Sequence, residues 1–219
     1  MEINLLTSFG HYDRNRKFSP EQNSPNLFPS DSKPYNLSYK EWTSKWWQWV
    51  ISIPKGKNPL CDHTGKNCAE GQYGPVWFLA GTSDKTHKPE RRCVIPTGKA
   101  ILFPIIVSQF SYSEVPFIKT DAELISYTAK DINRWSLLEV TIDGVKLPNL
   151  SEYRIQIGPF DLLIPEGNIW DIRPGPTRAV SDGFWVFLEP LSDGNYIVSL
   201  HGREPNFETR VTYYISILP

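Results

Sequence analysis

Acidic and aromatic side chains are the residues of this sequence whose types and spacing could do chemistry. In the stretch 38–53, Glu41, Lys45 and Gln48 are spaced to form a polar stripe on a helix, beside four tryptophans. A carboxylate held near aromatic walls can have a raised pKa and act as a general acid or base. The structural alternative is that Glu41 caps the helix and pairs with Lys45. The sequence leaves both roles open.

A second group of carboxylates is scattered along the chain. Glycosidases use two carboxyl groups roughly 5–10 Å apart on either side of a sugar, and the sequence cannot show which side chains converge. Asp182 precedes Gly183 at the start of a predicted strand, where a turn-forming aspartate is expected for backbone reasons alone. The candidates in this group are Asp62, Glu70, Asp161, Asp171, Asp182 and Glu189.

Histidine and amide side chains complete the catalytic candidates. No Gly-x-Ser-x-Gly motif is present, which argues against a serine nucleophile of that type. His201 is predicted at the end of a strand, where a histidine is more often a half-buried edge residue than a base. Lys45 and Arg203 could polarise a bound group. The candidate catalytic residues are therefore Glu41, Asp182, Gln72 and His201.

Tryptophans outside the predicted helix could bind a ligand. Trp170 falls in a loop rich in proline and glycine, predicted over 165–178, where no strand explains it. Exposed indoles form flat platforms for the apolar faces of sugar rings. The structural alternative is that Trp170 folds back as a lid on the core. The candidate ligand-binding residues are Trp46, Gln48, Trp77, Trp170, Trp185 and Arg203.

Cysteine and histidine residues give several alternatives. Thiolate and imidazole ligands suit zinc, and Cys61, His63, Cys68, His87 and Cys93 could supply four of them. Tight Cys-x-x-Cys knuckles are missing, so we predict no metal and no cofactor. A Cys68–Cys93 or Cys61–Cys68 disulfide would leave an odd thiol. In a reducing compartment all three thiols could be free.

Composition limits the classes of partner. The chain has 219 residues and a net charge of −1, whereas nucleic acids and anionic membranes select basic surfaces. No apolar run approaches the roughly 20 residues of a membrane helix. No signal peptide is visible at the start of the sequence. We expect no nucleic-acid or membrane partner.

The predicted fold is mainly β. A capping box at Ser38 and Glu41 begins the tryptophan-rich helix, about 38–53, and Pro54 ends it. Thr120 and Glu123 begin a second helix, about 120–134. Residues 1–36 are predicted to be an extended or partly disordered arm, and 37–219 a single antiparallel β-sandwich or jelly roll. We expect the tryptophan-rich helix to pack over one face of the sandwich or to plug one end, and so to fill its interior. The predicted strands are 76–80, 91–95, 99–107, 138–142, 145–147, 153–157, 162–164, 184–188, 195–201 and 209–218.

Several motifs over residues 38–217, taken together, resemble a family of uncharacterised, mostly exported prokaryotic proteins. The motifs are Trp46-Trp47-Gln48-Trp49 with Glu41-Trp42, Gly71-Gln72 with 76–81, Cys93-Val94-Ile95-Pro96 with 98–100, Asp182-Gly183-Phe184-Trp185, Pro190-Leu191 through Gly194, and Val211-Thr212-Tyr213. The resemblance implies a secreted β-sandwich with a Cys68–Cys93 bridge, and it implies no activity. Cys61 departs from the pattern.

The functional expectation is an extracellular or periplasmic protein that binds a small molecule, with a carbohydrate as the leading ligand class. The alternative is a hydrolase with glycosidase-like acid–base chemistry at Glu41, Asp182 or both. The two differ in what they require, because a hydrolase needs at least two carboxylates in one concave pocket with tryptophan walls. A binding module needs only the aromatic surface.

Overall fold

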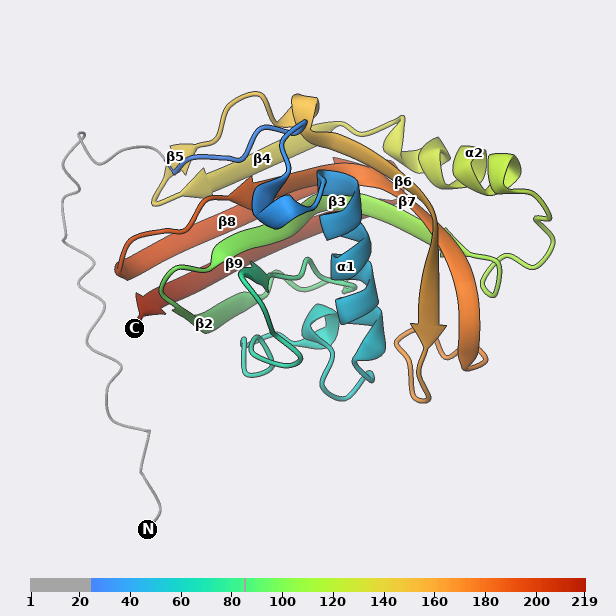
Figure 1. Ribbon diagram of the computed structural model, residues 1–219, viewed down its shortest axis with the longest axis horizontal. Helices are drawn as coiled ribbons and strands as arrows, with labels where there is room; N and C mark the ends of the chain where they lie inside the picture. Colours follow the sequence, from blue (N-terminus) through green and yellow to red (C-terminus); the bar gives the residue numbers. More distant parts are fainter. Residues whose placement is uncertain (1–24, 85) are drawn as a thin grey trace, which may run out of the picture.

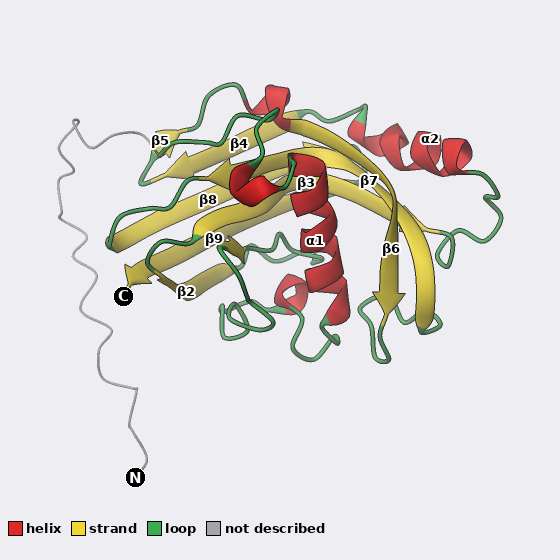
Figure 2. Ribbon diagram, viewed as in Figure 1, coloured by secondary structure: helices red, strands yellow, loops and turns green. Residues whose placement is uncertain are grey.

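Two β-sheets pack face to face, and α1 (Tyr39–Ser52) crosses the outer face of one of them (Figures 1 and 2). The computed structural model describes residues 25–84 and 86–219. The predicted mainly β sandwich with two helices is confirmed. One sheet has the order β1 (Val76–Phe78), β3 (Ala100–Ser111), β7 (Gly175–Leu188), β6 (Arg154–Ile164). The other has the order β2 (Glu90–Pro96), β9 (Phe207–Leu218), β8 (Gly194–Glu204), β4 (Leu137–Ile142), β5 (Val145–Lys146).

Most neighbouring strands are antiparallel, but one pair in each sheet is not. β1 runs parallel to β3, and β2 runs parallel to β9. The predicted antiparallel sandwich holds for the other strand pairs, and these two pairs at the sheet edges depart from it. Parallel neighbours need a long connection, and the segments that supply it here carry no periodicity that reveals the pairing.

Alternation along β7 creates two hydrophobic cores. Phe184 and Val186 point into the space between the sheets, whereas Trp185 and Phe187 point to the opposite face and contact the residues of α1. Successive side chains of a strand point to opposite faces, so one strand serves both cores. α1 covers one sheet from outside, so packing over one face is the predicted placement that the structure shows. The expectation that the helix also fills the interior of the sandwich was wrong.

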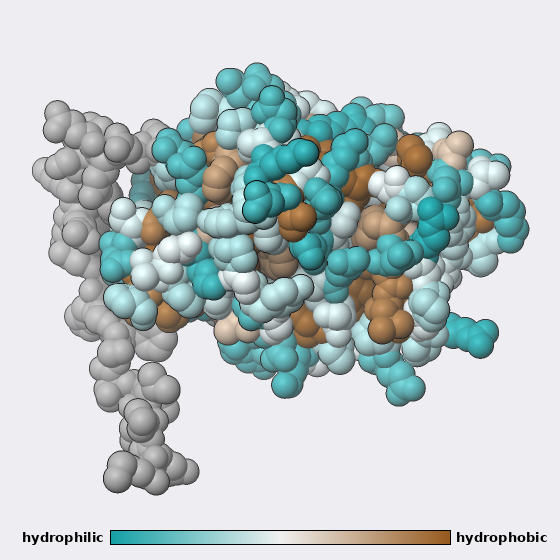
Figure 3. Space-filling model, in the orientation of Figure 1, coloured by the Kyte–Doolittle hydropathy of each residue, from teal (hydrophilic) through white to brown (hydrophobic). Residues whose placement is uncertain are grey.

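The ends of α1 follow the predicted chemistry. The backbone N–H of Ser38 donates to Glu41 Oε2 at 2.8 Å, and the side chain of Ser38 accepts from the N–H of Glu41. Trp42, Trp46 and Trp49 are buried as the helical spacing predicts, and so is Trp47. The outer surface around α1 is mostly hydrophilic or neutral, with small hydrophobic groups between (Figure 3). The four indoles therefore belong to the hydrophobic core between α1 and the sheet that contains β7.

The second helix and one hairpin also match their local signals. α2 (Asp121–Ile132) begins with a capping box between Thr120 and Glu123. β4 and β5 are joined by Asp143 and Gly144, both with positive φ, as a type I′ turn requires. Three short 3₁₀ helices lie at Pro34–Asn36, Pro59–Cys61 and Leu150–Tyr153. In the part of the chain that the structure describes, no helix is long and apolar enough to cross a membrane.

Two other boundaries differ from the prediction. β7 begins at Gly175, inside the predicted loop 165–178, so Asp182 lies in the middle of a strand rather than at its start. The predicted strands 153–157 and 162–164 form one strand, β6, with an irregularity between Ile157 and Phe160. Long strands interrupted by glycine or proline carry the sequence signals of chain breaks, which explains both differences.

Part of the predicted arm packs on the sandwich. Leu27 forms a bridge with Leu188, and the N–H of Phe28 donates to the carbonyl oxygen of Phe187 at 2.9 Å. The carbonyl oxygen of Phe28 accepts a hydrogen bond from the Tyr39 hydroxyl. The packed structure thus includes residues before the predicted boundary at 36. The rest of the predicted arm, residues 1–24, lies outside the described residues.

Candidate functional site

A cavity of about 550 Å³ lies along the free edge of β3. β1 pairs only with residues 100–102 of β3, and among the described residues no strand pairs with that edge farther along. The cavity lies where α1, the end of α2, the end of β8, the start of β9, the 3₁₀ helix Pro59–Cys61 and three loops (at 81–83, 114 and 169–170) approach this edge. Its walls are Trp46, Trp47, Leu60, Gly81, Thr82, Ser83, the β3 residues 104–110, Glu114, Asp131, Ile132, Ile169, Trp170, Glu204, Phe207 and Thr209.

The tryptophans contribute apolar surface to this cavity. Nε1 of Trp46 donates to the carbonyl oxygen of Leu79 at 2.9 Å, and Nε1 of Trp47 donates to Ser181 Oγ at 2.8 Å. Since both indole donors are used within the fold, these side chains offer the cavity only ring surface. Trp170 is half-buried and adds a third indole from the loop that precedes β7.

Two buried polar atoms on the cavity wall have no hydrogen-bond partner among the described residues. They are Oε1 of Gln109 and Oγ1 of Thr209, in side chains only 8% and 3% exposed. Buried polar atoms are nearly always satisfied in folded proteins, because leaving one unpaired costs about 1–3 kcal/mol. The fold thus leaves an amide oxygen and a hydroxyl group unpaired in two residues that line the cavity.

A half-buried carboxyl group lies beside this pair. Oε2 of Glu114 accepts hydrogen bonds from Gln109 Nε2 at 3.1 Å, from the Ser111 N–H at 2.8 Å and from the Ser111 hydroxyl at 2.6 Å. Burial raises the pKa of Glu114, and these hydrogen bonds partly offset that rise. Such a group is suited to exchange a proton nearer neutral pH than an exposed glutamate would.

The charged side chains on the cavity wall are all acidic. Besides Glu114, the described lining includes Asp131 and Glu204 and no lysine, arginine or histidine. The Glu204 side chain is 8% exposed and accepts a hydrogen bond from the N–H of Asn206. This charge pattern disfavours anionic ligands and is compatible with neutral or cationic ones.

Trp46 and Trp170 are the sequence-predicted binding residues that the fold brings to this cavity. Trp185 lies fully buried under α1, 5.3 Å from Trp46 between ring centres, and Trp77 lies in the core between the sheets. Gln48 donates to the carbonyl oxygen of Asp161. Arg203 does not line the cavity.

The predicted catalytic residues lie apart from one another. Glu41 closes the capping box of α1, and Gln72 holds the backbone of Phe78 through both its amide oxygen and its amide nitrogen. Asp182 is fully buried and accepts two hydrogen bonds from Arg154, at 2.9 and 2.6 Å. His201 Nε2 contacts Glu208 at 2.6 Å, and Glu208 also accepts from Arg203. None of these residues lines the cavity.

Sequence reasoning missed Gln109, Glu114 and Thr209. Their positions depend on the approach of β9 to β3, which no local pattern reveals. One signal was present, because Ser111 and Glu114 have the spacing of a capping box, and Glu114 does return to the N–H of Ser111. That spacing marks a turn and says nothing of a cavity.

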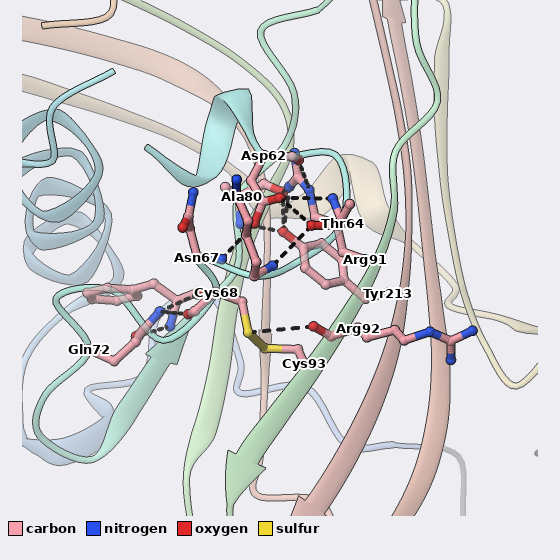
Figure 4. Close-up of a disulfide and its surroundings, with 12 residues drawn as sticks. Asp62, Thr64, Asn67, Cys68, Gln72, Ala80, Arg91, Arg92, Cys93 and Tyr213 are labelled. Atoms are coloured by element: carbon pink, nitrogen blue, oxygen red, sulfur yellow. Dashed lines mark hydrogen bonds between the residues drawn. A yellow bond between two sulfur atoms is a disulfide. The ribbon is translucent and has the colours of Figure 1, made fainter. Parts of the chain in front are cut away.

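Cys68 and Cys93 form a disulfide, as the family resemblance implied, and Cys61 is a free cysteine (Figure 4). The bond ties the loop after Pro59–Cys61 to β2. It removes two of the five zinc ligands considered from the sequence.

The fold and the site define the structural class of this protein. It is a β-sandwich with a helix over one outer face and a cavity lined by tryptophans and acidic side chains. No protein-family model matches this chain, and no match was found among curated proteins or solved structures. The function is therefore inferred from the cavity itself.

Proposed function

We propose that the protein binds a small molecule in the cavity along β3, and that a neutral carbohydrate is the ligand class that suits it best. The observation that carries this proposal is the pair of unpaired polar atoms, Gln109 Oε1 and Thr209 Oγ1, on the wall of an otherwise largely apolar cavity. Ligand sites in proteins are typically apolar concavities of about 300–1,000 Å³ with a few placed polar groups.

Sugars have both apolar C–H faces and hydroxyl groups, and the cavity wall offers partners for both. Their C–H faces pack on aromatic rings, which Trp46, Trp47 and Trp170 supply. Their hydroxyl groups both donate and accept, so one can donate to Gln109 Oε1 while another bonds to Thr209 Oγ1. The acidic side chains disfavour phosphorylated or carboxylated sugars.

The test is a titration of the native protein with a panel of neutral mono- and oligosaccharides, followed by calorimetry and by tryptophan fluorescence. We expect at least one member to bind, and Trp170→Ala to weaken its binding by about tenfold or more, equivalent to about 1.4 kcal/mol. Trp135→Ala is the matched control, because Trp135 is also partly exposed (37%) and does not line the cavity.

Two results would contradict this proposal. One is the absence of binding across the panel at millimolar concentrations. The other is an equal loss in the Trp135→Ala variant, which would place the ligand elsewhere or show a general effect on folding.

A hydrolase is the second candidate, favoured by the carboxyl groups that share the cavity. Glu114, whose pKa is raised by burial, would donate a proton to the leaving oxygen, and Glu204 or Asp131 would activate water or attack the sugar. These residues take the roles first assigned to Glu41 and Asp182. Glu114→Gln should abolish turnover of a glycoside and preserve its binding. A variant that retains turnover would exclude Glu114 as the acid.

We further propose that the protein works outside the reducing cytosol. The Cys68–Cys93 disulfide supports this, since such bonds persist in oxidising compartments. An alkylating agent added under denaturing conditions at lysis of the source cells should label one cysteine per chain, Cys61, as measured by mass spectrometry. Labelling of all three cysteines would contradict the proposal.

A further inference from the structure

A cluster of nitrogen and oxygen donors lies in the two segments that precede β2. His63 Nε2 is 3.6 Å from Asp84 Oδ2, and His87 Nδ1 is 2.6 Å from the same oxygen. One ligand atom from each of the three residues lies within 4.8 Å of the others, and the two imidazole ring centres are 4.8 Å apart. The sequence had suggested His63 and His87 as zinc ligands only in company with cysteines.

We propose that His63, Asp84 and His87 form a binding site for a divalent transition-metal ion of the zinc type. None of the three residues lines the proposed ligand cavity, and the site does not depend on that proposal. Two imidazole nitrogens and one carboxylate oxygen are a donor set that zinc, nickel, copper and cobalt accept, whereas magnesium and calcium require mostly oxygen ligands.

The carboxylate is oriented for this role by its neighbours. Oδ1 of Asp84 accepts hydrogen bonds from the Thr86 N–H and hydroxyl, both at 2.7 Å, and from the His87 N–H at 3.2 Å. These bonds occupy one oxygen and leave Oδ2 directed at the two imidazoles.

A buried guanidinium holds the two segments that carry the ligands. Arg91 is 1% exposed, and its Nε donates to the carbonyl oxygen of Asp62, next to His63. Its Nη1 donates to the carbonyl oxygens of Ala80 and Gly81, in the segment that leads to Asp84. Figure 4 shows Asp62, Ala80 and Tyr213 gathered around Arg91, with the disulfide beside them.

The His63 segment is fixed further by the disulfide and by Asp62. Cys68 is bonded to Cys93 in β2, and the N–H of Arg92 donates to the carbonyl oxygen of Thr64. The Asp62 carboxylate accepts from the N–H groups of Thr64 and Asn67, both at 2.8 Å. His63 is therefore held against the start of β2, and His87 leads into that strand. Ligands that are held in place by their surroundings bind a metal ion more tightly than mobile surface side chains do.

The three donors are open to solvent and are spaced close to a coordination shell. The side chains of His63 and His87 are 44% and 63% exposed, so an ion can enter and water can fill the remaining positions. Ligand atoms of a tetrahedral zinc site lie about 3.4 Å apart, given zinc–ligand distances of about 2.1 Å. Rotation of the exposed imidazoles would bring the present spacing to that value.

The test uses tag-free, chelator-treated protein titrated with Zn²⁺ by calorimetry, with Co²⁺ absorption as a second measurement. We expect one equivalent to bind. Asp84→Asn and the double variant His63→Ala/His87→Ala should each weaken binding by about 100-fold or more, because loss of outer-shell partners alone costs about 10–100-fold. Zn²⁺ should also raise the thermal midpoint of the native protein and leave that of the double variant unchanged.

Two control variants address adventitious binding. His201→Gln removes an imidazole that also contacts a carboxylate, Glu208, and Cys61→Ser removes the free thiol near these segments. Both should retain the full affinity for Zn²⁺. The proposal is overturned if native protein binds no Zn²⁺, if the double variant binds as tightly as native protein, or if either control loses the ion equally.

Discussion

The polar atoms of the α1 tryptophans are hydrogen-bonded, whereas two polar atoms in the lining of the neighbouring cavity are not. All four indole N–H groups of α1 donate a hydrogen bond. Trp42 donates to the carbonyl oxygen of Pro34, Trp46 to that of Leu79 and Trp49 to that of Glu70. Trp47 donates to the hydroxyl oxygen of Ser181. In the residues that line the cavity, Gln109 Oε1 and Thr209 Oγ1 are buried and have no hydrogen-bond partner in the described part of the chain. A satisfied polar atom stabilises the fold, whereas an unsatisfied one costs stability unless a ligand or water completes it.

The comparison has three exceptions. Among the described residues, Nε1 of Trp185 (under the same helix), Nε1 of Trp77 and Nη2 of Arg91 are also buried without a partner, and none of these residues lines the cavity. Nothing in the structure explains these three atoms.

Removing the most buried indole of α1 should have the largest effect on stability. Trp46 is fully buried between Trp47, Trp49 and Trp185. Trp46→Ala should lower the free energy of unfolding by about 4 kcal/mol, through lost burial and the cavity left behind. Urea denaturation followed by circular dichroism measures this. Trp135→Ala, at a partly exposed indole, should cost clearly less, and equal losses would contradict the account of α1.

Removing one acceptor under α1 should have an intermediate effect. Ser181 is buried and accepts from Trp47 Nε1 at 2.8 Å. Ser181→Ala leaves that indole N–H buried and unpaired, so the free energy of unfolding should fall by about 2 kcal/mol. An unchanged midpoint in chemical denaturation would show that the bond to Trp47 contributes nothing.

Glu114→Gln should change stability in a pH-dependent way. Burial raises the folded-state pKa of Glu114 above its unfolded value. Below the unfolded pKa both states are protonated, and the native protein loses nothing. As the pH rises through the unfolded and then the folded pKa, ionisation favours the unfolded chain, at about 1.4 kcal/mol for each pKa unit.

The variant should therefore gain stability relative to native protein between acidic and neutral pH. Denaturation at pH 3.5 and pH 7 measures the difference, and the same difference at both values would contradict it. Glu152→Gln, at an exposed glutamate, provides the control.

Features governed by neighbouring residues could be predicted from the sequence. The capping boxes at Ser38 and Thr120 and the turn at Asp143 and Gly144 involve contacts within a few residues. The burial of Trp42, Trp46 and Trp49 follows from helical spacing alone.

Features that depend on distant segments could not be predicted. The parallel neighbours of β3 and β9 and the pairing of Asp182 with Arg154 join residues far apart in the chain. The cavity has the same origin, because Gln109 and Thr209 belong to strands in different sheets. A sequence pattern gives the side of a strand that a residue faces, but not the strand that lies opposite.

The most direct test of the central claim compares two buried threonines. Thr128 donates from Oγ1 to the carbonyl oxygen of Leu124 at 2.8 Å, whereas Thr209 Oγ1 has no partner among the described residues. Replacement by valine removes each hydroxyl at nearly constant volume. Thr128→Val should lower the free energy of unfolding by about 1 kcal/mol.

Thr209→Val should leave the free energy of unfolding unchanged or raise it, and should weaken carbohydrate binding. A loss of stability at Thr209 as large as that at Thr128, with carbohydrate binding intact, would show that the hydroxyl serves the fold and would contradict the account.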